Sequence, residues 1–89
     1  MPRTLPHVLT ECQRHVRWAA DAKTLATIVP DDAEHHRERA EGYAKQACAL
    51  MEEAMLLVIN ATPGQLARWL SSRDPRVRQF VIEWMDVRD

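Results

Sequence analysis

The positions of the prolines limit what this chain can fold into more than any other feature of its sequence. Proline begins or ends a helix, because its ring fixes φ and it has no N–H to donate. Prolines at positions 6, 30, 63 and 75 divide a chain that has only two glycines and is rich in alanine and leucine, a composition that favours helix over strand. The sequence therefore predicts an all-α domain of four helices, at about 5–29, 33–60, 63–71 and 75–86.

Capping residues stand in front of each predicted helix. Thr62-Pro63-Gly64-Gln65 has the pattern of a capping box with proline at the first helical position, and Asp74-Pro75 repeats the device. Thr4 precedes the first predicted helix, and Asp31 and Asp32 precede the second, so their side chains are expected to cap those helices.

Apolar residues in the first two predicted helices recur at spacings of three and four, as one buried face requires. In the first helix these are Leu5, Val8, Leu9, Cys12, Val16, Ala19 and Ala26; in the second they are Ala40, Tyr43, Ala44, Ala47, Met51, Ala54, Met55 and Val58. Because the connection at Pro30 is short, the two helices should pack as an antiparallel hairpin, with facing residue numbers summing to about 61.

Two apolar regions fall outside that buried face. Trp18, Leu25 and Val29 lie at about 200–240° if Leu5 is set at zero and each residue adds about 100°. Either the C-terminal helices or a second chain must cover them, and the sequence leaves both alternatives open. Residues 55–59 are apolar all round and need a cover, most simply the C-terminal helices.

Composition and charge indicate one ordinary soluble domain. The 89 residues carry a net charge of −1, so the whole molecule is not suited to bind nucleic acid by charge alone. The N-terminus lacks the apolar segment of a signal peptide, and no apolar run approaches the roughly 20 residues of a membrane span. We expect a cytoplasmic protein, in which Cys12 and Cys48 are two buried, reduced thiols.

Reactive side chains do not converge in a pattern that predicts catalysis. Cys12 and His15 with His36 and Cys48 superficially resemble a zinc set, but hairpin pairing places His36 nearly three turns from the level of Cys12. His7, Glu11 and His15 share one helix face without a nucleophile beside them. We therefore predict no metal site, no cofactor and no enzymatic activity.

The C-terminal third resembles two known helical motifs. One is the helix-turn-helix, over residues 65–80, which implies DNA binding with Arg76, Arg78 and Gln79 on the recognition helix. Ser71 stands where such turns usually have glycine, and Ser72 where they usually have an apolar residue. The other is a single helical hairpin of the HEAT type, whose second helix often opens Asp-Pro-x-Val-Arg, as residues 74–78 do here. This second resemblance implies a packing mode, since one hairpin makes no solenoid.

The favoured hypothesis is a small non-enzymatic protein-binding module, with a small DNA-binding protein as the alternative. Tryptophan and arginine dominate binding hot spots, and the candidate partner-binding residues are Arg68, Trp69, Arg73, Arg76, Arg78, Gln79, Trp84, Trp18 and Leu25. The partner is expected to be a protein, and pairing with a second copy is also compatible with so short a chain.

The charge distribution suggests a third binding surface. Residues 30–61 hold three basic and seven acidic residues, so the acidic face of the second helix could dock in a basic groove that normally holds nucleic acid. Size and composition would suit a phage- or plasmid-encoded inhibitor that docks on a larger complex.

Overall fold

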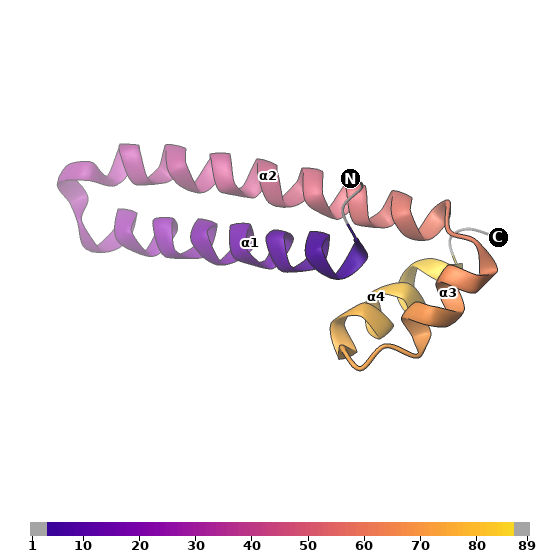
Figure 1. Cartoon of the computed structure of the whole chain (residues 1–89). Coiled ribbons are helices and arrows are strands. Elements are labelled where there is room, and N and C mark those ends of the chain that lie inside the picture. Colours follow the sequence, from indigo (N-terminus) through magenta and orange to yellow (C-terminus); the bar gives the residue numbers. More distant parts are fainter. Residues whose placement is uncertain (1–3, 87–89) are drawn as a thin grey trace.

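The computed structural model of the chain describes residues 4–86 and contains four α-helices and no strand in that range. Helices α1 (Leu5–Ile28) and α2 (Ala33–Ile59) are joined by a 3-10 turn, η1 (Pro30–Asp32), and are followed by α3 (Pro63–Leu70) and α4 (Pro75–Met85). Figure 1 shows α1 and α2 as a long antiparallel pair, with α3 and α4 folded beneath the end where α1 begins. The predicted all-α fold is confirmed, and the last residue predicted for each helix is its C-cap.

The predicted capping interactions form at α3 and α4. Thr62 Oγ1 accepts from the Gln65 backbone N–H at 3.2 Å, and Gln65 Oε1 accepts from the Thr62 N–H at 2.9 Å, which completes the capping box. Asp74 Oδ1 accepts from the Arg76 N–H at 3.0 Å. Thr4 and Asp32 occupy the N-cap positions of α1 and α2, but neither side chain accepts a capping hydrogen bond, so that part of the prediction was wrong.

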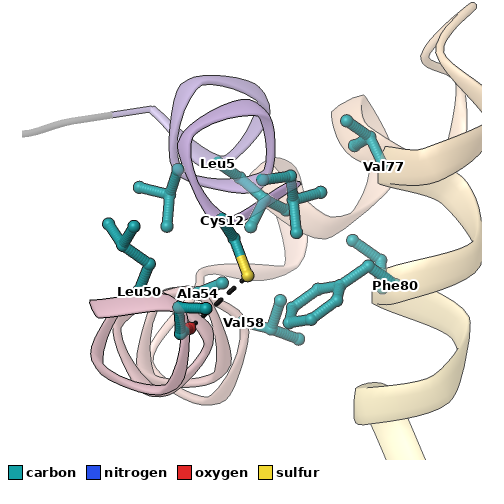
Figure 2. Packing of buried hydrophobic residues seen from close by; sticks show 11 residues of the cluster. Leu5, Cys12, Leu50, Ala54, Val58, Val77 and Phe80 are labelled. Carbon is teal, nitrogen blue, oxygen red and sulfur yellow. Dashed lines mark hydrogen bonds between the residues drawn. The ribbon is translucent and has the colours of Figure 1, made fainter. Parts of the chain in front are cut away.

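The hydrophobic core lies at one end of the molecule, where α4 crosses the hairpin (Figure 2). Its largest fully buried side chains come from α1, α2 and α4: Leu5, Val8, Val58, Val77 and Val81. Seven partly buried residues pack against this cluster: Met55, Leu57, Leu66, Trp69, Leu70, Trp84 and Met85. We call this end of the molecule the base.

Beyond the base, the hairpin continues as a two-helix arm formed by residues 13–46. Every buried side chain in the arm is an alanine: Ala19, Ala22 and Ala40. Alanine allows two helix backbones to approach closely, but each buried methyl group contributes only about 0.8 kcal/mol. The arm therefore gives the molecule its elongated shape, 53 × 27 × 21 Å, while most of the hydrophobic burial is at the base.

The predicted buried faces were too wide. Val16, Ala44 and Met51 were predicted to be buried but are exposed, whereas Leu50 was not predicted and is buried. A helix in a two-helix arm has one neighbour, so it buries one narrow row of side chains rather than the broad face of a helix in a globular core. Val16 lies on a flank that α4 covers only as far as Leu9 and Gln13, and it remains 55% exposed.

Candidate partner-binding surfaces

A cleft of about 540 Å³ opens at the base, between the end of α2, helix α3 and the start of α1. We call it the base cleft, and its lining residues are Thr4, Leu5, Glu53, Leu56, Leu57, Asn60, Gln65, Arg68 and Trp69. The cleft contains two of the predicted partner-binding residues, Arg68 and Trp69. An apolar hollow with a few polar groups at its edge is the usual form of a binding site.

The side chains of the base cleft differ in how firmly the fold holds them. Trp69 is partly buried and packs against the core, so its ring forms a fixed wall. Arg68 is exposed, and Leu56 is 50% exposed although it follows Met55 in the apolar end of α2. Met55 and Leu57 are partly buried against the core, whereas Leu56 faces outward.

Arg76, another predicted partner-binding residue, holds α4 against α1. Its guanidinium donates to Gln13 Oε1 at 2.6 Å, to Thr10 Oγ1 at 3.3 Å and to Asp74 Oδ2 at 2.8 Å. Hydrogen bonds from Arg76 to the Asp74 carboxylate lower the pKa of that carboxyl, and the same contact raises the pKa of the guanidinium. The side chain therefore has a structural role in joining two helices.

The remaining predicted residues of the C-terminal hairpin have different surroundings. Arg78 donates to the backbone carbonyl of Ser72 at 2.6 Å and so closes the turn between α3 and α4. Gln79 donates to Glu83 at 3.2 Å. Trp84 is half-buried against Phe80, with ring centroids 6.1 Å apart, whereas Arg73 is exposed. The predicted C-terminal set thus does not form one continuous surface of free side chains.

Trp18, the predicted binding residue in the middle of the arm, belongs to a small aromatic cluster. Its ring centroid lies 5.1 Å from that of His15 and 5.6 Å from that of Tyr43, across the seam between α1 and α2. Arg39 donates to the Tyr43 hydroxyl at 3.3 Å. His15 Nδ1 lies 2.8 Å from the Glu11 carbonyl oxygen and must donate to it, because a carbonyl only accepts.

The C-terminal helices do not cover this cluster. Trp18 remains 43% exposed, and Leu25, two turns further along the same flank of α1, is 39% exposed. Of the two alternatives that the sequence left open, cover by α3 and α4 does not occur. The sequence did not single out Tyr43 as a contact residue, although its predicted place on the inner face of α2, level with Trp18, was an available signal.

The two cysteines lie in different environments. Cys12 is buried, and its thiol donates to the Ala47 carbonyl oxygen at 3.5 Å. Burial, with a smaller effect of the neighbouring Cys48, raises the pKa of the Cys12 thiol. Cys48 is free and exposed, so the prediction of two buried thiols was wrong for this residue. It borders a shallow groove lined also by Val16, Ala20, Lys23 and Ala44.

Acidic side chains and a histidine cluster at the tip of the arm. A shallow hollow there is lined by Asp31, Asp32, Glu34, His35 and Glu38. Within residues 4–86, no three His, Cys, Asp or Glu side chains are arranged to hold a metal ion. The residues of this hollow are exposed and cover only the start of the second helix, whose acidic face was predicted as a third binding surface.

Over the same residues, no helix combines the length and the apolar character needed to cross a bilayer. Comparisons with protein-family models, with curated proteins and with solved structures found no match to this chain.

Proposed function

We propose that this chain is a small, non-enzymatic protein-binding module and that a partner protein docks in the base cleft. The observation that carries the proposal is the presence of Trp69, Arg68 and a half-exposed Leu56 around one apolar hollow. A bound side chain there would be desolvated by apolar walls, which is the setting in which tryptophan and arginine contribute most to affinity.

The chemistry of the base cleft indicates what such a partner presents. Leu5, Leu56 and Leu57 favour an apolar side chain as the anchor. Arg68 at the edge favours a carboxylate beside that anchor, since guanidinium and carboxylate form bidentate hydrogen bonds. The expected partner segment therefore combines a bulky apolar residue with a neighbouring Asp or Glu.

The proposal also extends to the cellular setting. The two free cysteines support a reducing, cytoplasmic location. The acidic tip of the arm supports a larger partner with a basic surface, because opposite charges speed encounter and fix orientation. An inhibitor that occupies such a surface is the specific role that we propose for testing.

Substitutions at exposed positions test the base cleft without disturbing the core. Partners are captured from the source organism's lysate on immobilised wild-type protein, Leu56→Glu, Arg68→Glu and Ile82→Glu, and are identified by mass spectrometry. Ile82 on α4 is the matched control, because it is 53% exposed, as Leu56 is 50% exposed, and it does not line the cleft. We expect a partner retained by wild type and Ile82→Glu and lost from both cleft variants.

Two outcomes of this experiment contradict the proposal. One is that every partner of the wild type is retained by Leu56→Glu and by Arg68→Glu. The other is loss with all three variants despite unchanged circular dichroism, which would place the contact elsewhere.

The DNA-binding alternative is tested on the same proteins. The geometry offers it less support, because Arg76, Arg78 and Gln79 hydrogen-bond within the chain. A protein that recognises DNA sequence needs such side chains free to hydrogen-bond to base edges. Retardation of duplex DNA at low salt that weakens steeply as salt rises would favour DNA binding over the base-cleft proposal.

A further inference from the structure

The arm buries little apolar surface and exposes several large hydrophobic side chains. Fixing the backbone of one residue costs about 1–2 kcal/mol, and the arm offsets this with the burial of three alanines. Five of the eight large hydrophobic residues that are exposed in residues 4–86 belong to the arm: Val16, Trp18, Leu25, Ile28 and Val29. A second layer of helices over the arm would give it the core that it lacks.

Three of these residues form a stripe along one flank of α1. Trp18, Leu25 and Val29 follow at spacings of seven and four, so they recur on one side of the helix. His15 and Tyr43 extend the stripe toward α2 through their contacts with Trp18. We call Trp18, Leu25 and Val29 the arm stripe.

Nothing in the described part of the chain obstructs this flank. Helix α4 approaches the hairpin through Leu9, Gln13 and Met51. Leu9 lies about 180° around α1 from Trp18, at about 100° per residue. The C-terminal hairpin thus packs against the opposite flank, and a flat partner can lie along the arm stripe.

Charges at the two ends of the arm stripe select the partner and its direction. Arg14 lies one turn before Trp18, and Asp31 and Asp32 follow Val29. A second copy that runs antiparallel brings Arg14 level with the acidic pair of its partner at both ends. A parallel copy would bring like charges together, which is unfavourable. Arg14 already contacts Glu11 at 2.9 Å and is 59% exposed, so it can reach an added carboxylate.

The same antiparallel arrangement places the apolar side chains together. Asp31 and Asp32 lie in η1, and the hairpin pairing places Asp32 level with Val29. If Arg14 lies level with that acidic pair of the second copy, facing residue numbers in α1 sum to about 43, and the two-fold axis passes near residues 21–22. Leu25 then lies about 5 Å along the helix from that axis, at a rise of 1.5 Å per residue, and level with Trp18 of the second copy.

The available area fits a weak, concentration-dependent dimer. Residues 14–28 of α1 span about 21 Å along the helix axis, and two helices side by side are about 20 Å wide. Face-to-face packing therefore covers roughly 400 Å² on each copy, or about 800 Å² in total, which is the size of a weak interface.

We propose that the arm stripe is a homodimer interface, in which the arms of two copies pack antiparallel about a two-fold axis near residues 21–22 and form a four-helix bundle. Each dimer then carries one base at each end. This inference does not depend on the base cleft, because no residue of the arm stripe lines that cleft.

Sedimentation equilibrium of the full chain tests the dimer. For the wild type we expect twice the chain mass of 10.3 kDa at high concentration, with dissociation on dilution from about 200 µM to about 1 µM. Leu25→Glu places a charge level with Trp18 of the second copy and should shift dissociation to at least tenfold higher concentration. Val16→Glu is the matched control on the opposite flank of the same helix and should leave the dimer unchanged.

Charge reversal tests the direction of packing and does not depend on a change in folding. Arg14→Glu alone, and Asp31→Arg with Asp32→Arg, should each weaken the dimer, and combining all three substitutions should restore it. A monomeric wild type over the whole concentration range overturns the proposal. So does equal loss of dimer in Leu25→Glu and Val16→Glu, and failure of the combined variant to recover overturns the antiparallel arrangement.

Discussion

At the scale of single residues, the accessibility of the two thiols is determined by which side of the seam each cysteine faces. Cys12 is buried beside the Ala47 carbonyl and has a raised pKa, whereas Cys48 is exposed. Only the thiolate reacts readily with alkylating agents. We therefore expect iodoacetamide at neutral pH to modify Cys48 in the native protein and Cys12 only after denaturation, as mapped by peptide mass spectrometry. Equal modification of both residues in the native protein would contradict the assigned burial.

Asp74 gives the fold a specific acid sensitivity. Its pKa is lower in the folded chain than the ordinary value of about 3.9. A depressed carboxyl pKa contributes stability above the unfolded pKa, and that contribution is lost as pH falls through the folded value. Asp74→Asn should therefore melt below the wild type at neutral pH.

The difference in melting temperature between these two proteins should shrink as pH falls below about 4, the ordinary carboxyl pKa, and level off once the folded wild-type carboxylate is protonated at its lower pKa. Thermal melts at several pH values measure this convergence. Because Asp74 is solvent-accessible, the effect is expected to be small. A constant difference from neutral to acidic pH would show that the carboxylate charge is not what stabilises the turn.

At the scale of helices, a glycine destabilises the part of α2 that lies in the arm. Gly42 lies in the interior of α2, and a Cβ atom added there would meet no heavy atom within 4 Å. Glycine costs a helix interior about 0.5–1 kcal/mol relative to alanine, because it loses more backbone freedom on folding. Gly42→Ala should raise the free energy of unfolding by about that amount in urea titrations. The reverse change two residues further along α2, at the exposed Ala44, should lower it by a similar amount, and an unaltered midpoint in both Gly42→Ala and Ala44→Gly would contradict this account.

The helix boundaries were predictable because their signals are local. Pro30, Thr62 and Asp74 act on their immediate neighbours, and each predicted end lies within one residue of the observed one. Burial was less predictable, because it depends on the number and direction of neighbouring helices. A helical period places Val16 and Cys12 on the same face, but only knowledge that α4 stops near Gln13 shows that Val16 stays exposed.

The candidate binding surfaces show the same limit. Arg68 and Trp69 were predicted as binding residues from residue type alone, and both line the base cleft. Leu56 could not be distinguished from Met55 or Leu57 in an apolar run, because its exposure depends on the direction in which α3 leaves α2. Arg76 was selected by the same residue-type rule, yet the fold gives it intramolecular partners that sequence spacing does not reveal.

At the scale of the whole molecule, the uneven burial predicts uneven local stability. The base holds the large buried side chains, and the arm holds buried alanines. Regions with few buried apolar contacts open at lower free energy and exchange their amide hydrogens sooner. In dilute solution we expect amides of residues 15–27 and 35–45 to exchange before those of residues 50–58, as followed by hydrogen–deuterium exchange. Protection of the arm equal to that of the base at low concentration would contradict this prediction.

Because the core lies at one end, the length of the arm can change without altering the contacts that stabilise the fold. A matched insertion of seven residues on each side of Pro30 adds two turns to both helices, which lengthens the arm by about 10 Å and preserves which side of each helix faces its neighbour. Every contact among Leu5, Val58 and Val77 would remain as it is. Chains that carry such insertions would differ in arm length by regular increments and keep the same base. An engineered series of these lengths would serve as a set of molecular rulers.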